Sequence, residues 1–260
     1  MATKNISSGV NYATQIAIVA ICIFLIAKCC YAQPSHGANM VAPEPGSMAL
    51  IVTGIAGGIV RFARMRFKEF KRIFDIIVSA VGLVVAIPAV LFTALIIKVV
   101  SPGPAFFTQK RVGCNGKIFT IYKLRSMRID AEKHTGATWA KENDSRLIRF
   151  GKYIRKARLD ELPQLLNVLK GEMSIIGPRP ERPELIEGLK EVIPDYEKRL
   201  QIKPGITGLA QVWHKYDETI QDVKKKIRYD LLYIKKMCFL VDLRILARTM
   251  IVVATGRGAK

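Results

Sequence analysis

The longest apolar stretch of the chain covers residues 74–100, and polar side chains within it are few and scattered. It is long enough to cross ~30 Å of hydrocarbon as a helix. Basic residues flank both of its ends, however, and the positive-inside rule places both flanks in the cytoplasm. Such a segment must turn back. Pro88 marks the predicted bend of a re-entrant helix-break-helix hairpin, because proline removes one helical hydrogen bond and clashes with the preceding turn.

The first 60 residues contain two further apolar segments, joined by a linker with Pro, Gly and Ser at residues 33–47. Residues 13–32 are long enough for a membrane helix, which is the favoured interpretation. Cys30-Tyr31-Ala32 resembles a signal-peptidase site, but the amino-terminal region carries only Lys4, and a secretory signal needs more positive charge. Residues 48–60 are marginal for a full span. One span, two spans and a cleaved signal therefore all stay open.

A basic segment with interleaved phenylalanines, residues 61–72, precedes the hairpin, and Glu69 is its single acidic residue. A solvated charged face would explain the cations but not the phenylalanines. We therefore expect a helix that lies on an anionic lipid leaflet.

The remainder of the chain predicts a small globular domain in which helices outnumber strands. Alternating residues 118–123 predict a short strand or hairpin, and residues 184–190 predict a helix. Four leucines at helical spacing predict a central helix: Leu162, Leu165, Leu166 and Leu169. Asp160 is its predicted N-cap, and Gly171 is its predicted stop. Residues 217–254 show an amphipathic helical pattern, for which a place on the membrane and a place in the core are equal alternatives.

These elements predict an α+β fold that is mainly helical. It comprises a re-entrant membrane hairpin helix, interfacial amphipathic helices and a small cytoplasmic globular catalytic domain. The expected regions are residues 1–60 as membrane segments and linker, residues 61–103 as basic helix and hairpin, and residues 104–260 as the catalytic domain.

The composition is that expected of a protein at a membrane surface. The chain has 41 Lys and Arg but only 21 Asp and Glu, and 50% of its residues are hydrophobic. A nucleic-acid binder would share the positive charge but would not need long apolar runs, and no motif of that class is found. The five cysteines form no C-x-x-C pair, so neither a zinc site nor a disulfide framework is indicated, and a reducing cytoplasm fits. The lone His134 is interpreted as a surface residue.

The candidate chemistry lies at two adjacent carboxylates, Asp160 and Glu161. The predicted helix start puts them at the positive end of a helix dipole, with Arg155, Lys156 and Arg158 just upstream. An anionic substrate would be drawn to such a place. Taken alone, however, an Asp before a leucine-rich helix is usually an ordinary cap.

A second candidate is Arg179, which lies between Pro178 and Pro180. The two prolines restrict the backbone on both sides and so limit where the guanidinium can point. Pro-Arg-Pro on its own is usually no more than a stiff turn.

Short motifs spread over roughly residues 67–260 favour a functional role for these residues over an ordinary cap and a stiff turn. The motifs are Lys71-Arg72-Ile73-Phe74-Asp75, Gly103-Pro104, Gln109-Lys110-Arg111-Val112-Gly113, Lys123-Leu124-Arg125-Ser126-Met127, Leu159-Asp160-Glu161-Leu162-Pro163-Gln164, Ile176-Gly177-Pro178-Arg179-Pro180 and Lys203-Pro204-Gly205-Ile206-Thr207-Gly208. Together they resemble the bacterial sugar transferase family, and more specifically its monotopic polyprenyl-phosphate phosphoglycosyl transferases.

The resemblance implies transfer of a sugar 1-phosphate from a UDP-sugar to polyprenyl (undecaprenyl) phosphate, with release of UMP, as the first step of exopolysaccharide or other glycoconjugate synthesis. It implies that Asp160 is the nucleophile of a covalent aspartyl-phosphosugar intermediate and that Glu161 is a ligand of Mg²⁺. The implied phosphate-binding residues are Arg155, Arg179, Lys123 and Arg125. The enzyme is expected at the bacterial inner membrane, with its catalytic domain on the cytoplasmic face.

Two other functions were weighed. A non-catalytic scaffold of polysaccharide assembly would not need the intact Asp160-Glu161 pair, and a peripheral protein that merely binds anionic lipid would leave both that pair and Pro178-Arg179-Pro180 without a role. The expected partners are the UDP-sugar, the polyprenyl phosphate and anionic membrane lipids, with no nucleic acid and with a homodimer left open. The sugar and the polymer are not specified.

Overall fold

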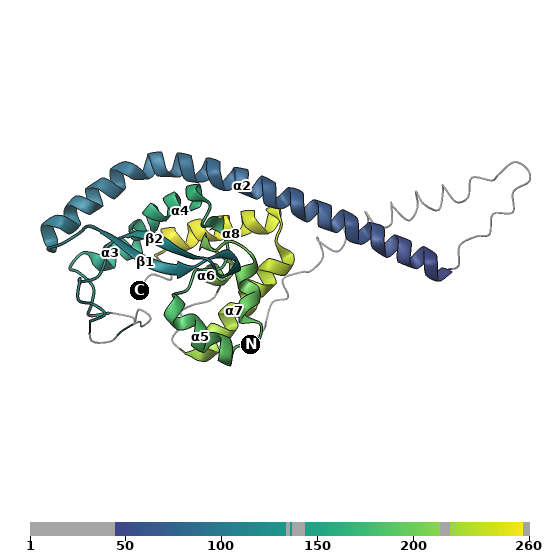
Figure 1. The fold of residues 1–260 in the computed structure, drawn as a ribbon. Coiled ribbons are helices and arrows are strands. Elements are labelled where there is room, and N and C mark those ends of the chain that lie inside the picture. Colours follow the sequence, from purple (N-terminus) through teal and green to yellow (C-terminus); the bar gives the residue numbers. More distant parts are fainter. Residues whose placement is uncertain (1–44, 134–135, 137–143, 214–218, 257–260) are drawn as a thin grey trace, which may run out of the picture. The chain divides into compact units, whose positions relative to one another are not determined.

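The computed structural model describes residues 45–133, 136, 144–213 and 219–256, with side chains described from Phe67 onward (Figure 1). The chain divides into two compact units, Met1–Arg66 and Phe67–Lys260. The predicted membrane segment at residues 13–32, most of the linker and His134 lie outside the described residues. The second unit combines many helices with a few short strands, which agrees with the α+β, mainly helical prediction.

Helix α2 spans Pro45–Val100 and is continuous through Pro88. Its part from Phe67 to Val100 is long and apolar enough to cross a membrane. The predicted break at Pro88 is not observed; α2 stays helical on both sides of the proline and follows a curved path (Figure 1). A proline removes a single backbone hydrogen bond, and a long helix can absorb that loss by bending. The re-entrant topology itself stays a prediction.

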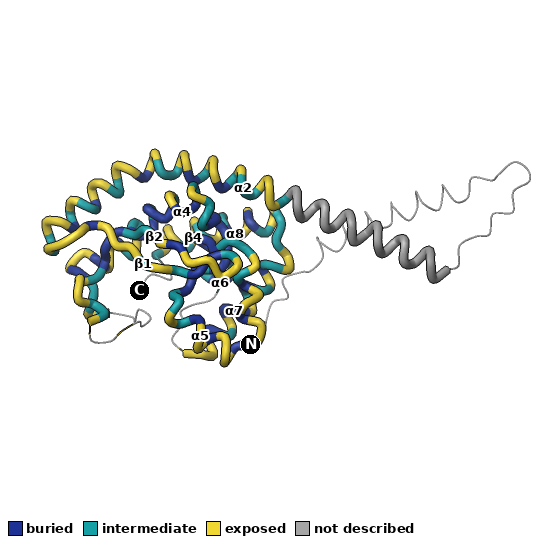
Figure 2. The backbone as a smooth tube through the Cα atoms, viewed as in Figure 1, coloured by how far each residue is buried: buried dark blue, intermediate teal, exposed yellow. Residues whose placement is uncertain are grey.

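From Phe67 onward, the outer side of α2 is exposed and carries many apolar residues, whereas its inner side packs on the domain (Figure 2). Val84, Val85 and Val99 are 70%, 73% and 79% exposed, while Ala86 and Ile97 are buried. Exposed apolar surface of this extent marks a contact with lipid or with another protein. The apolar helix therefore indicates a membrane-associated protein.

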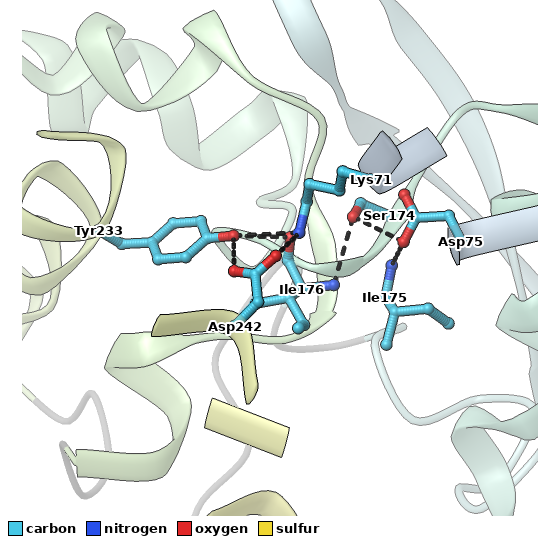
Figure 3. A network of polar contacts seen from close by, with 7 residues as sticks. All are labelled: Lys71, Asp75, Ser174, Ile175, Ile176, Tyr233 and Asp242. Carbon is cyan, nitrogen blue, oxygen red and sulfur yellow. Dashed lines mark hydrogen bonds and ion pairs between the residues drawn. The ribbon is translucent and has the colours of Figure 1, made fainter. Parts of the chain in front are cut away.

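Near its start in the second unit, α2 is tied to the carboxyl-terminal helices by a buried polar triad (Figure 3). Lys71 Nζ lies 2.5 Å from Asp242 Oδ2 and donates to the Tyr233 hydroxyl at 3.1 Å, and that hydroxyl donates to Asp242 Oδ1 at 2.6 Å. Tyr233 belongs to α7 (Ile220–Lys236) and Asp242 to α8 (Phe239–Ala254). These two helices confirm the helical pattern predicted across residues 217–254.

One turn further along α2, Asp75 holds strand β3 (Ser174–Ile176). Its Oδ1 accepts hydrogen bonds from the Ser174 hydroxyl at 3.1 Å and from the Ile175 amide at 3.0 Å (Figure 3). The carboxylate is 2% exposed, so these donors supply part of the solvation that burial removes. The membrane helix and the domain are therefore packed as one unit from Phe67 onward.

A β-hairpin follows α2 and confirms the strand predicted at residues 118–123. Strands β1 (Phe106–Val112) and β2 (Ile118–Leu124) pair antiparallel, with Phe106 opposite Leu124 and Val112 opposite Ile118. The turn contains Asn115 and Gly116 at φ values of 55° and 75°, a conformation that Asn and Gly adopt most readily. The carboxyl end of β2 leads directly to Lys123, a candidate site residue.

The other elements are short and surround a core shared by β2, β3 and the carboxyl-terminal helices, in which Ile121, Val168, Met173, Ile176 and Ile245 are buried. Helix α5 confirms the helix predicted at residues 184–190. The short elements are α3 (Gly151–Lys156), η2 (Leu159–Gln164), α4 (Leu165–Lys170), α5 (Pro183–Val192), η3 (Tyr196–Gln201), β4 (Gly205–Thr207) and α6 (Leu209–Trp213).

Strands β3 and β4 form a second, parallel sheet, and glycines allow the backbones beyond it to meet. A Cβ on Gly205 would overlap the Gly177 backbone nitrogen, and one on Gly177 would lie 2.5 Å from the Lys203 carbonyl oxygen. Neither neighbour is a flexible side chain that could move aside. This close approach fixes the segment that continues from β3 into Pro178 and Arg179.

We predict that Gly205→Ala lowers the free energy of unfolding by ~1–3 kcal/mol, because the added methyl group meets backbone atoms. Gly188→Ala is the matched control: it lies in α5 with open space around its Cβ, and it should raise stability by ~0.5–1 kcal/mol through helix propensity. Thermal unfolding of the detergent-solubilised protein measures both. A Gly205→Ala protein as stable as wild type would contradict the close packing.

Candidate active site

The two adjacent carboxylates lie in a tight turn between α3 and α4. Arg158 adopts a left-handed conformation, with φ 56° and ψ 20°, and η2 begins immediately after it. The predicted N-cap role of Asp160 is wrong, because α4 begins only at Leu165 and Asp160 lies in the first turn of η2. Pro163 lacks an N–H to bond within that turn, and the segment forms a 3-10 helix before the α-helix starts. The predicted stop is confirmed, since Gly171 caps α4 at φ 84°.

Glu161 is buried and is surrounded by three cations. Its Oε1 accepts from Arg179 Nη2 at 2.6 Å and lies 3.7 Å from Lys123 Nζ, and its Oε2 lies 3.9 Å from Arg158 Nη1. Burial by itself would raise the pKa of Glu161, but Arg179, Lys123 and Arg158 together hold this pKa well below its usual range. Glu161 is therefore ionised throughout the physiological range.

Asp160 lies beside this cluster but differs from Glu161 in its hydrogen bonding and in the direction of its pKa shift. It is 7% exposed, and its Oδ1 has no hydrogen-bond partner among the described residues. Burial raises the pKa of Asp160, and the neighbouring Glu161 charge raises it further, against the opposing effect of Lys123 and Arg155. The structure thus keeps one buried carboxylate oxygen unbonded next to several cations.

The structure brings three of the four predicted phosphate-binding residues to these carboxylates. Arg179 and Lys123 contact Glu161 directly, and Arg155 Nε donates to the Ser126 hydroxyl at 2.9 Å and interacts electrostatically with Asp160. Burial, together with the Arg179 charge, lowers the pKa of Lys123 to about 8. The Arg179 side chain is 32% exposed, so it can reach both Glu161 and a ligand.

The fourth predicted residue, Arg125, has different contacts. Its guanidinium is buried and donates to the carbonyl oxygens of Pro102 at 2.7 Å and Ser101 at 2.8 Å, directly after α2. These contacts tie the end of α2 to the end of β2. Arg125 therefore helps to hold the fold together, and its role in substrate binding stays a prediction.

Two residues of the site were not predicted as binding residues. Arg158 reaches Glu161 only because its backbone is left-handed, and an Arg at that position gives no sequence signal for this conformation. Ser126 positions Arg155 through its hydroxyl, and its place beside Lys123 and Arg125 in the sequence was the one available indication.

The carboxylates of Asp160 and Glu161 could hold Mg²⁺ only if a ligand or water supplied further oxygen atoms. The described residues contain no group of three or more His, Cys, Asp or Glu side chains that could hold a metal ion. Asp160 and Glu161 offer hard carboxylate oxygens, the type that Mg²⁺ prefers, and phosphate oxygens or water would have to complete its octahedral shell. Prolines 88, 178 and 180 take no part in this chemistry; the last two flank Arg179.

Comparisons with known proteins agree with this arrangement. The model of the family described as bacterial sugar transferase matches residues 66–256. The chain is 45% identical over 194 residues to a UDP-N-acetylgalactosamine-undecaprenyl-phosphate N-acetylgalactosaminephosphotransferase of Aeromonas hydrophila, a match that covers 75% of this chain and 46% of the relative. It is 42% identical over 215 residues to a UDP-glucose:undecaprenyl-phosphate glucose-1-phosphate transferase of Xanthomonas campestris pv. campestris, covering 82% and 44%.

A third relative is as short as the matched region. The exopolysaccharide production protein PSS of Rhizobium leguminosarum bv. phaseoli is 41% identical over 194 residues, which cover 72% of this chain and 97% of the relative. The chain thus spans about half the length of the Aeromonas and Xanthomonas relatives and nearly all of the Rhizobium one. The described site lies wholly within residues 66–256, the region that the family model matches.

We predict that Asp160→Asn raises the free energy of unfolding at pH 7 by ~0.5–2 kcal/mol, because it removes a buried charge that Glu161 repels. A carboxyl whose pKa is raised by folding binds its proton more tightly in the folded state, so wild type gains relative stability as the pH falls. The advantage of the variant should therefore shrink toward acidic pH.

Thermal unfolding between pH 7 and pH 4 measures this difference. Asp195→Asn is the matched control, because Asp195 is exposed and pairs with Lys198 on the surface, and it should change stability by less than ~0.5 kcal/mol. An Asp160→Asn protein less stable than wild type at pH 7 would show that the surrounding cations make the Asp160 charge favourable.

Proposed function

Because the chain belongs to the bacterial sugar transferase family, we propose that it transfers a sugar 1-phosphate from a UDP-sugar to a polyprenyl phosphate and releases UMP. The relatives named above act on undecaprenyl phosphate or take part in exopolysaccharide production, which supports this acceptor and an initiating step in polysaccharide synthesis. The observation that carries the proposal is the unbonded Oδ1 of Asp160 beside Lys123, Arg155 and Arg179.

In the first step, an Asp160 carboxylate oxygen attacks the phosphorus that bears the sugar, and the bond from this phosphorus to the UMP oxygen breaks. UMP leaves with the electron pair, and a sugar phosphate stays bound to Asp160. In the second step, a phosphate oxygen of the polyprenyl phosphate attacks the same phosphorus and returns Asp160 to a free carboxylate. One site serves both steps, and one difficult transfer is divided into two.

The cations and Glu161 support these steps in different ways. Arg179, Arg155 and Lys123 bind phosphate oxygens and neutralise the charge that develops on them. Glu161 stays ionised because of its low pKa and keeps Arg179 oriented toward Asp160. Bound Mg²⁺, held by Glu161 and by donor phosphate oxygens, would supply further charge neutralisation.

We predict that wild-type protein incubated with a reactive UDP-sugar and no polyprenyl phosphate carries an adduct of sugar-phosphate mass on the peptide with Asp160, with one UMP released per adduct. Asp160→Asn should give neither adduct nor UMP, since a carboxamide cannot replace the attacking oxygen. Glu161→Gln should lose most activity, and higher Mg²⁺ should restore part of it. Mass spectrometry and a UMP assay over a panel of UDP-sugars make these measurements.

Asp195→Asn again serves as the control and should form the adduct at the wild-type level, because this residue is exposed and paired with Lys198. An active Asp160→Asn enzyme would falsify the covalent mechanism. A wild-type protein that releases no UMP from any UDP-sugar would instead favour a non-catalytic membrane scaffold.

We further propose that the apolar part of α2, Phe67–Val100, enters one leaflet and that both ends of this part stay on the cytoplasmic side. Contacts at the two ends support this topology, because both reach the same domain. At the first end, Arg72 donates to the last carbonyl oxygens of α4, at Val168 (2.6 Å) and Leu169 (2.8 Å). At the second, Arg125 binds the carbonyl oxygens that follow α2. A helix that crossed ~30 Å of hydrocarbon would carry one end away from the domain.

Cysteine labelling tests the topology. We predict that Lys68→Cys and Lys117→Cys, in a cysteine-free background, react with a membrane-impermeant maleimide in inverted inner-membrane vesicles and stay unreactive in intact spheroplasts. Both positions are exposed and lie on opposite sides of the apolar stretch 74–100. Val85→Cys is the control for a lipid-covered position and should react only after detergent is added. Labels at positions 68 and 117 that report opposite sides would make α2 a true span.

A further inference from the structure

The loop that carries Arg179 is held almost entirely through its carbonyl oxygens. Pro178 and Pro180 have no N–H to donate, so two of its residues can form backbone hydrogen bonds only as acceptors. Four consecutive carbonyl oxygens each accept a hydrogen bond from outside the loop: Pro178 from the Gly205 amide (2.9 Å), Arg179 from Arg199 Nη2 (2.8 Å), Pro180 from Arg111 Nη1 (3.0 Å) and Glu181 from the Val112 amide (3.0 Å). These donors come from β4, η3 and β1.

Arg199 is the donor for the carbonyl of Arg179 itself, and it is held rigidly. Its side chain is 2% exposed, and the same Nη2 that binds the Arg179 carbonyl lies 2.8 Å from Asp230 Oδ2, which is also 2% exposed. Its Nη1 donates to the Tyr196 hydroxyl at 3.0 Å. The branched guanidinium thus hydrogen-bonds the carbonyl oxygen and the hydroxyl in a fixed geometry while its charge is paired with the Asp230 carboxylate.

A second buried ion pair lies beside the first. Lys226 Nζ is 2.6 Å from Glu181 Oε1, and both side chains are less than a tenth exposed. Lys226 and Asp230 are four residues apart on α7, so one face of that helix presents a cation to Glu181 and an anion to Arg199. Helix α7 thus holds the loop at two adjacent points.

Stability alone is a weak explanation for two such pairs. Desolvation of buried charges offsets much of their attraction, and apolar side chains of similar volume often stabilise a fold as well or better. What an apolar replacement could not do is bind the carbonyl oxygens of a loop whose two prolines provide no amide. The charged cluster therefore has a geometric effect on the Arg179 backbone.

We propose that Arg199, oriented by Asp230, is a positioning residue that sets the direction of the Arg179 guanidinium toward Glu161 and the substrate phosphate. This proposal rests on the proposed function. Arg199 does not contact Asp160 or Glu161 in the described structure; it acts through the backbone of Arg179.

The test is a double-mutant cycle on the full-length enzyme, with UMP release from the accepted UDP-sugar as the readout. Arg199→Lys keeps the charge but cannot bridge all three partners, and it should lower kcat roughly tenfold to a hundredfold with little change in KM. Arg179→Lys should cause a loss of the same order. Because both variants disturb one guanidinium, the double variant should be within about threefold of Arg179→Lys alone.

Glu197→Gln is the matched control. Glu197 lies on the same η3 helix, but its pair with Lys190 is on the surface, so its kinetics should equal those of wild type. Losses that multiply in the double variant, or an Arg199→Lys enzyme with wild-type kcat, would overturn the proposal. Asp230→Asn is less suitable, because removing one partner of a buried pair endangers folding itself.

A chemical readout tests the positioning without any turnover. Pairing with Glu161 should protect Arg179 from phenylglyoxal, and Arg199→Lys should raise the modification rate of Arg179 severalfold, as followed by peptide mass spectrometry. Glu197→Gln should leave this rate unchanged. An unchanged rate in Arg199→Lys would reject the positioning role. If wild type released no UMP while the rate still rose, the proposed function would fail and the positioning of Arg179 would stand.

Discussion

Glu161 is an ionised carboxylate that is almost removed from water, and much of the surrounding structure compensates for this. A charge in such a place costs free energy unless cations and hydrogen bonds replace its hydration. Arg179 comes from the loop after β3, Lys123 from β2, and Arg158 from the left-handed residue before η2. Segments that are distant in sequence therefore meet at the Glu161 carboxylate, and Asp160, the proposed nucleophile, lies directly beside it.

The apolar helix is part of the same construction. Asp75 of α2 binds the hydroxyl and amide of strand β3, and β3 leads within three residues to Arg179. At its other end, α2 meets β2 through Arg125 just beyond Lys123. The part of α2 from Phe67 onward is thus joined near both of its ends to a strand that carries or leads to a cation beside Glu161. The contacts that hold α2 on the domain therefore also hold the segments that form the polar site.

Local pattern was sufficient for the parts of the fold that neighbouring residues decide. Alternation predicted the hairpin at β2, periodicity predicted α5, α7 and α8, and Gly171 ended α4 as expected. The candidate site was predicted from Asp160, Glu161 and Arg179 because their motifs resemble those of a known family, since each motif alone also fits an ordinary cap or turn.

Interactions between distant segments decided the rest. Asp160 is no cap of α4 because η2, which contains Pro163, comes between them, and α2 continues through Pro88 without a break. The contacts of Arg125 with the carbonyl oxygens of Ser101 and Pro102 were not predicted, and its role in phosphate binding stays a prediction. The Arg199-Asp230 pair joins η3 to α7 and leaves no local signature, since a charge on a helix usually faces water.

The loop held by its carbonyl oxygens also limits how this site can diverge. Two of its four anchors are main-chain amides, at Val112 and Gly205, and the Val112 amide is kept by every substitution except proline. The other two are arginine side chains, Arg111 and Arg199, which a single substitution can remove. Mutations that change the orientation of Arg179 without touching Asp160 or Glu161 are therefore expected mainly at Arg111 and Arg199. A search for altered donor selectivity would begin at Arg111 and Arg199, because both can change while every group that is proposed to bind the phosphate stays the same.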